Sequence, residues 1–109
     1  MFNKNNSLKL FGALLALTCA SSVAQEAFSP EEVKKGAKVY ASNCESCHGV
    51  RMLGPQWGID LATFPRDNAR RFVDSVTNGT KAMPPWGDVL KPDEIQALWA
   101  YVVAGDPRN

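Results

Sequence analysis

The chain has 109 residues, and its 12 Lys and Arg against 11 Asp and Glu give a formal net charge of only +1. A charge this close to zero argues against binding to nucleic acid or to an anionic membrane, because both require a strong basic field. The length allows one small domain, and a domain of this size struggles to bury enough apolar surface without a cofactor, metal or disulfide.

Residues 1–24 have the pattern of a secretory signal peptide that is cleaved off. Lys4 and Lys9 precede a short apolar run at 10–17, and Ser22-Val23-Ala24 places small residues where a signal peptidase reads the chain. The apolar run is too short to span a bilayer, so we expect no transmembrane segment. The sequence therefore predicts a mature domain at 25–109 that is exported to the periplasm.

A lipoprotein is the alternative to simple cleavage, because Cys19 lies inside the expected signal and would then become the acylated first residue. Thr18, directly before it, is unusual for such processing, so lipid anchoring through Cys19 is the weaker alternative. Cys44 and Cys47 are the two cysteines that remain once the signal is removed.

A first helix is predicted from Pro30 to about Ser42. Ser29 offers a capping hydroxyl, and a proline at the first helical position is favourable because its missing N–H would have no helical partner. An apolar stripe recurs at helical spacing, formed by Val33, Gly36, Ala37 and Tyr40, whereas three lysines lie off it: Lys34, Lys35 and Lys38. We expect Gly36 to let another helix approach closely.

The segment Cys44-Glu45-Ser46-Cys47-His48, which contains the only histidine of the chain, has the C-x-x-C-H pattern of covalent haem attachment. The two thiols can add across the two vinyl groups of one haem, and the adjacent imidazole can then bind the iron. A redox-active cysteine pair would be expected with a thioredoxin-like strand pattern, which is missing here. A zinc site would lack a fourth Cys or His donor. The motif predicts haem c attached through Cys44 and Cys47, with His48 as an iron ligand.

Two further helices are predicted beyond the motif. One runs from Asn68 to Asn78, with Asp67 as its cap, Gly79 as its stop and an apolar face of Ala69, Phe72, Val73 and Val76. The other begins at Pro92 and ends before Gly105, with a stripe of Ile95, Leu98, Trp99 and Val102 bordered by Tyr101. The intervening segments 49–66 and 79–91 are punctuated by glycine and proline and show no sustained strand alternation, so the fold class is all-α.

The second axial ligand of the iron is expected to be Met83. Met52 follows His48 by only four residues, which would keep both on one side of the haem ring. Met83 lies farther along the chain, in a loop stiffened by prolines and close to Trp86, which could pack on the haem. The alternatives are ligation by Met52, a vacant site, or a Met83 that merely fills core space. His/Met ligation leaves no vacancy for a substrate and favours electron transfer over enzymatic catalysis.

On these residues the chain resembles the class I cytochrome c family over nearly all of its mature length. Gly36, Tyr40 and Cys44 match the N-terminal helix of that family, and the matching residues of the C-terminal helix are Leu98, Tyr101 and Val102. The resemblance implies the class I cytochrome c fold, in which three main helices and loops wrap around one covalently bound haem.

The same resemblance assigns two loop positions. Pro55 is similar to the proline whose carbonyl accepts a hydrogen bond from the ligating histidine, here His48, although a plain turn residue is the alternative. The segment 78–84 is similar to the loop of the family that carries the methionine ligand. A short stretch after His48 resembles the small bacterial members and leaves open which residues cover the haem propionates, with Trp57, Arg66 and Arg70 as candidates.

The function implied by the resemblance is a monomeric periplasmic carrier that passes single electrons between redox proteins whose identity the sequence does not reveal. A dedicated haem subunit of a periplasmic dehydrogenase, for example a quinoprotein, is the alternative. A ligand-binding or sensor haem protein is less favoured, because the cytochromes c′ carry their haem motif near the C-terminus, whereas here it stands at 44–48.

Overall fold

The computed structural model describes Gly12, Ala16 and residues 28–109. It contains α1 (Pro30–Asn43), α2 (Glu45–His48), α3 (Ala69–Asn78) and α4 (Pro92–Ala104), with short 3₁₀ turns at Val50–Met52 and Leu61–Thr63. Within 28–109 the only β pairing is an isolated bridge between Thr80 and Met83, so the all-α prediction is confirmed. No helix in the described part of the chain is long and apolar enough to cross a membrane.

The expected signal peptide, its cleavage site and Cys19 lie outside the described residues, apart from Gly12 and Ala16.

The start of α1 follows the predicted capping pattern. The side-chain oxygen of Ser29 accepts the N–H of Glu32 at 3.2 Å, and Pro30 occupies the first turn. The helix ends at Asn43, one residue beyond the prediction, and its three lysines are exposed as expected. It buries Val33, Gly36 and Tyr40, and also Val39, which lies next to the predicted stripe.

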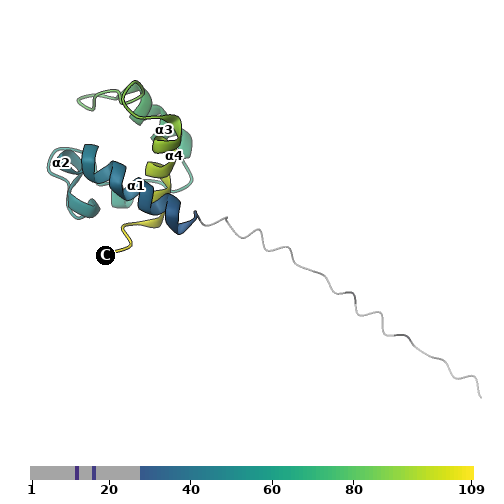
Figure 1. The fold of residues 1–109 in the computed structure, drawn as a ribbon. Helices are drawn as coiled ribbons and strands as arrows, with labels where there is room; N and C mark the ends of the chain where they lie inside the picture. The colour runs from purple at the N-terminus through teal and green to yellow at the C-terminus, as the bar shows by residue number, and fades with distance from the viewer. Residues whose placement is uncertain (1–11, 13–15, 17–27) are drawn as a thin grey trace, which may run out of the picture.

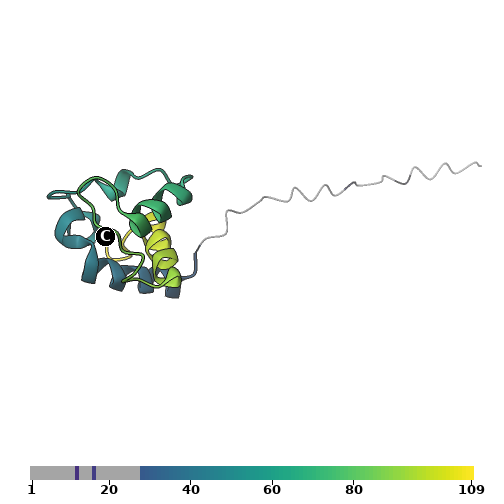
Figure 2. The same ribbon diagram turned by 90° about the horizontal axis from the view of Figure 1, so that it is seen from above.

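Helices α1 and α4 pack directly against each other, as both views of the ribbon show (Figures 1 and 2). At their crossing, a Cβ atom on Gly36 would overlap the backbone carbonyl of Ala97 and touch the Cβ of Tyr101. Next to this contact the rings of Tyr40 and Tyr101 lie 5.0 Å apart between centroids. The predicted close approach at Gly36 is therefore present, and α4 is the helix that makes it.

The other side of α4 packs against α3 through an aromatic cluster. Trp99 lies 5.2 Å from Phe72 and 6.0 Å from Phe64, measured between ring centroids. Because α4 is covered on both sides, it is buried beyond its predicted stripe, and Tyr101 is 0% exposed. The α1–α4 pair and this cluster form the core on which the loops of the site rest.

The N-terminus of α3 differs from the prediction in two residues. Asn68 caps the helix by accepting the N–H of Arg71 with its side-chain oxygen at 3.2 Å, so the assignment of the cap to Asp67 was wrong. Ala69 is exposed and takes no part in the apolar face, whereas Phe72 and Val76 are buried. Both differences arise because the helix begins one residue later than its periodicity predicts.

Candidate haem-binding site

The haem motif forms a single helical turn that continues directly from α1. Cys44 is both the C-cap of α1 and the N-cap of α2. Its carbonyl oxygen accepts the N–H of His48 at 3.0 Å. Spacings of three and four residues place Cys44, Cys47 and His48 along one side of this turn. Cys44 is half-buried, Cys47 is exposed and His48 is buried, so the three side chains face the boundary between the core and solvent.

The loop after the motif folds back beneath the histidine. The backbone N–H groups of Gln56, Trp57 and Gly58 all lie close to the carbonyl oxygen of Cys47, at 3.1, 3.1 and 3.0 Å. A Cβ atom on Gly58 would lie 2.5 Å from both Cε1 and Nδ1 of His48. The imidazole therefore rests on a backbone surface that a side chain at position 58 would destroy.

The carbonyl partner of His48 is Ile59, and the expectation that Pro55 supplies it was wrong. Nδ1 of His48 lies 2.9 Å from the carbonyl oxygen of Ile59. The three hydrogen bonds to the carbonyl of Cys47 hold the following loop under the imidazole. This places the carbonyl of Ile59, the residue after Gly58, next to Nδ1. Pro55 instead packs near Gly49, where an added Cβ would lie 3.3 Å from the proline nitrogen. With Nδ1 bonded to protein, Nε2 is the ring nitrogen available to iron.

The surroundings of Cys44 favour its neutral thiol. Burial, with a smaller contribution from Cys47, raises the pKa of the Cys44 thiol to about 12, so this thiol is neutral at physiological pH. Among the described residues, no group of three or more His, Cys, Asp and Glu side chains is arranged to hold a metal ion.

Met83 lies in a tight turn that is tied to the end of α3. Thr80 and Met83 exchange two backbone hydrogen bonds, at 3.1 and 2.9 Å, across a turn in which Lys81 has a φ of 52°. The N–H of Trp86 then donates to the carbonyl of Val76 at 2.8 Å. Met83 is partly buried against the core, whereas Met52 is a core residue only 5% exposed. Burial of Met52 agrees with a packing role.

The three residues considered for covering the haem propionates differ in whether their side chains already have a partner in the protein. Arg66 donates from Nε to the carbonyl of Val103 in α4 at 3.0 Å, and Arg70 forms an exposed ion pair with Asp74 at 3.7 Å. Trp57 is 86% exposed. Both arginines therefore have protein partners, and Trp57 is the candidate with a free side chain.

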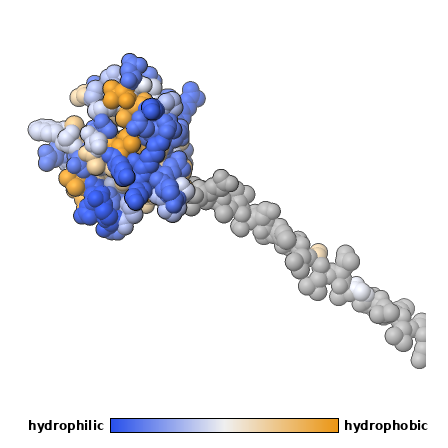
Figure 3. All heavy atoms as spheres, in the orientation of Figure 1, coloured by the Kyte–Doolittle hydropathy of each residue, from blue (hydrophilic) through white to orange (hydrophobic). Residues whose placement is uncertain are grey.

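The residues around His48 fit a large flat apolar group. Trp57 and Ile59, which bracket the glycine under the imidazole, are 86% and 56% exposed, although apolar side chains of this size are normally covered. In Figure 3 the surface over α1 is mostly hydrophilic, and hydrophobic atoms show at the top and centre of the face and at its left edge, on the side where Figure 1 places α2. The residues that would hold a haem here are Cys44, Cys47 and His48, and exposed apolar side chains flank the glycine on which the imidazole rests.

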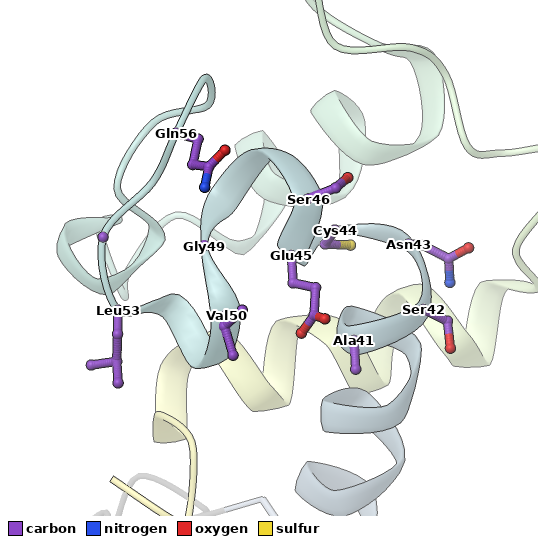
Figure 4. Close-up of a pocket in the computed structure, with 11 residues that line it drawn as sticks. Ala41, Ser42, Asn43, Cys44, Glu45, Ser46, Gly49, Val50, Leu53 and Gln56 are labelled. Carbon is purple, nitrogen blue, oxygen red and sulfur yellow. The ribbon is translucent and has the colours of Figure 1, made fainter.

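A separate open pocket of about 560 Å³ lies beside the motif, between the end of α1, α2 and the loop that follows (Figure 4). Its lining includes Cys44, Glu45, Val50, Leu53 and Gln56 but neither His48 nor Met83. The pocket touches the motif from outside and does not define the position of the iron.

Comparison with known proteins identifies the family. Residues 31–102 match the family described as "Cytochrome C oxidase, cbb3-type, subunit III". Cytochrome c6 of Nostoc sp. is 36% identical over 102 residues, which cover 89% of this chain and 88% of that protein.

Solved structures agree with this assignment. Cytochrome cL of the marine bacterium Methylophaga aminisulfidivorans superposes with a TM-score of 0.61 at 26% identity, over 70% of this chain and 54% of that one. This chain thus corresponds to about half of that cytochrome. Cytochrome c6 of the diatom Phaeodactylum tricornutum gives a TM-score of 0.51 at 29% identity, over 66% and 91% of the two chains. The chain therefore belongs to the cytochrome c family, as a small c-type cytochrome of class I fold that carries covalently bound haem c and transfers electrons.

Proposed function

We propose that the protein is an exported monohaem carrier that passes single electrons between redox proteins, with its iron ligated by His48 and Met83. Haem c, when bound, supplies an iron that alternates between two oxidation states. The observation that carries the proposal is the fixed imidazole of His48, which is seated on Gly58 and bonded through Nδ1 to Ile59.

The setting of His48 suits an iron ligand in an electron carrier. A hydrogen bond from Nδ1–H to a carbonyl fixes the tautomer and the ring orientation and makes Nε2 a stronger donor. Because the acceptor is backbone and the loop is tied to Cys47, the ring can hold its orientation in both oxidation states. Little rearrangement on electron transfer is what a carrier requires.

The setting of Met83 supports its assignment as the second ligand. Its loop continues into Pro84 and Pro85, which restrict the backbone, and is bonded to the end of α3. Its side chain is only partly buried, so the sulfur is not committed to the core as that of Met52 is. Ligation by both His48 and Met83 would leave the iron no open site for a substrate, which favours a carrier over an enzyme.

Export to the periplasm is supported by the signal pattern at residues 1–24 and by the chemistry at the motif. In the exported protein, attachment of haem would use the thiols of both Cys44 and Cys47. We further propose that the protein acts as a monomer toward its partners.

A dedicated haem subunit of a larger oxidoreductase is the second candidate, because the family matched over residues 31–102 is named for an oxidase subunit. The two candidates differ in assembly state. Recovery of the native protein in a stable stoichiometric complex with an oxidoreductase would support the subunit, and recovery as a free monomer would support the carrier.

Replacement of Met83 by alanine tests the ligation. We expect the oxidised Met83→Ala protein to lose the optical charge-transfer band between sulfur and iron and to have a lower reduction potential, because thioether sulfur stabilises ferrous iron. Met52→Ala is the control, since it removes a buried methionine at a cost of roughly 2–5 kcal/mol in stability and should keep the band. Persistence of the band in Met83→Ala, or rapid carbon monoxide binding by the reduced wild type, would contradict the assignment.

A further inference from the structure

We propose that Tyr40, Tyr101 and Asp106 are positioning residues for the histidine ligand, and that they act by holding the turn that follows it. None of their side-chain hydrogen bonds reaches the imidazole, and the effect passes through the backbone of Gly49. The inference rests on the proposed ligation of iron by His48 and concerns what keeps that ligand in place.

Tyr40 holds the residue next to the ligand. Its hydroxyl, in a side chain only 1% exposed, donates to the carbonyl oxygen of Gly49 at 2.5 Å. The N–H of Met52 donates to the same oxygen at 3.1 Å. Burial is the main reason that the pKa of Tyr40 is raised to about 12, so the phenol remains a donor throughout the physiological range. The carbonyl of Gly49, the residue after His48, is thus fixed by two donors, one of which comes from α1.

The turn held by Tyr40 is conformationally demanding. Gly49 has a φ of 92°, and the next residues include Arg51 at 53° and Met52 at 59°, which are unusual values for side chains other than glycine. Such conformations persist only where the surroundings determine them. Asn109 supplies a second restraint, because its side-chain amide donates to the carbonyl of Arg51 at 3.0 Å.

Tyr101 fixes the position of the Tyr40 ring. The two rings pack at 5.0 Å between centroids with an interplanar angle of 43°, and Tyr101 is completely buried. The hydroxyl of Tyr101 donates to Oδ2 of Asp106 at 2.6 Å. Because neither ring has free space, a displacement of Tyr101 must be passed on to Tyr40.

Asp106 is the fixed point of the arrangement. Asp106 follows the C-cap of α4, and its side chain is 0% exposed. Its carboxylate accepts a hydrogen bond from the hydroxyl of Tyr101. It also accepts three from Arg108, from the backbone N–H at 2.8 Å, from Nε at 2.8 Å and from Nη2 at 2.6 Å. A carboxylate is costly to bury, and here every acceptor site faces a donor. The contacts run from Asp106 through Tyr101 and Tyr40 to Gly49, the neighbour of His48.

Two conservative variants of the haem-loaded protein, Tyr40→Phe and Tyr101→Phe, remove one hydroxyl each and keep the rings. We expect the Nδ1 proton of His48 in the reduced protein to exchange with solvent roughly fivefold faster in each variant, the effect of losing about one buried hydrogen bond. A loosened bond to Ile59 makes the imidazole a weaker donor, so the reduction potential should rise. In the double variant, the changes in exchange rate and in reduction potential should be smaller than the sum of those in the single variants. The reason is that both hydroxyls act through the same turn at Gly49.

Matched controls separate positioning from general stability. Val33→Ala removes buried surface from the other end of α1 and should lower thermal stability while leaving the His48 exchange rate and the potential unchanged. Asp106→Asn should raise the His48 exchange rate and the reduction potential as Tyr101→Phe does. Asp93→Asn, which removes an exposed carboxylate of α4 paired with Lys35, should leave both unchanged. Phenylalanine variants that lose stability but keep the wild-type exchange rate and potential would overturn the inference.

Failure of this inference is distinguishable from failure of the proposed ligation. A sulfur–iron band that persists in Met83→Ala would refute the second ligand and leave the positioning of His48 intact. Unchanged exchange in the phenylalanine variants would refute positioning and leave both ligands intact. A wild-type protein whose spectra show no histidine on the iron would overturn both proposals.

Discussion

At the level of single residues, Asp106 shows how a charged group is accommodated in a small core. The guanidinium of Arg108 is the main cause that holds the pKa of its carboxyl far below the usual range, and the Tyr101 hydroxyl acts in the same direction. Burial, together with the hydrogen bond to Asp106, raises the pKa of Tyr101, so the phenol stays protonated. Asp106 is therefore ionised in the native protein at neutral pH, and its carboxylate accepts hydrogen bonds from Tyr101 and Arg108.

Asp106→Asn should lower the free energy of unfolding at neutral pH by about 2 kcal/mol, the typical worth of hydrogen bonds to a charged group. Because the native pKa is depressed, the contribution of Asp106 is complete above the unfolded-state pKa of about 3.9 and is lost as the pH falls toward the lower native value. Denaturant titrations of both proteins between about pH 7 and pH 3 measure this. The difference in stability between the two proteins should begin to shrink below about pH 4, and a difference that stays constant down to about pH 3 would contradict the prediction.

At the level of helices, the contact between α1 and α4 depends on the absence of a side chain at Gly36. Alanine usually favours a helix over glycine by about 1 kcal/mol. Here its Cβ would overlap the carbonyl of Ala97, which is backbone and cannot rotate away as a flexible side chain could. The steric conflict therefore outweighs the gain in helix propensity.

Gly36→Ala should destabilise the protein by about 2 kcal/mol, because the two helices must separate to admit the methyl group. Thermal and denaturant unfolding of the haem-loaded protein measure the effect. Ser42→Ala, at an exposed position of α1, is the control and should change stability by no more than a few tenths of a kcal/mol. A Gly36→Ala protein as stable as the wild type would show that the contact is looser than the structure indicates.

At the level of the whole molecule, the helices form a frame whose loops carry an uncovered apolar surface beside His48. Trp57 and Ile59 are exposed while Trp99 and Tyr101 close the core on the α4 side. A small chain gains stability from any covalently fixed group that covers such a surface. Haem attachment and stability of the fold are therefore expected to depend on each other.

Expression of the full chain with export tests this coupling and the proposed signal together. The exported protein should begin at Gln25 and carry the mass of one haem, as measured by intact-mass spectrometry. The Cys44→Ala/Cys47→Ala double variant should begin at the same residue, lack haem and unfold at a lower temperature. A chain that retains Met1, or that bears a lipid on Cys19, would contradict the proposed processing.

Several local features could be predicted because they depend on neighbouring residues. The N-cap at Ser29 and the start of the last helix at Pro92 are each specified within a few residues. The helical turn of α2 through Cys44, Cys47 and His48 was not predicted. The wrong cap at Asp67 shows the limit of this reasoning, since Asp67 and Asn68 are chemically similar and the path of the chain selects between them.

The sequence by itself determined the covalent haem site, the all-α class and the close helix contact at Gly36, because each is encoded by residue types at short spacing. Only the tertiary structure decided that Ile59 bonds His48, that Gly58 lies beneath the ring and that Asp106 is buried. Backbone carbonyls are identical at every position, so no residue type marks which one will face Nδ1. Aspartate is usually exposed, so the sequence alone does not indicate that Asp106 is buried. Its burial depends on the fold, which brings Tyr101 and Arg108 within hydrogen-bond distance of its carboxylate.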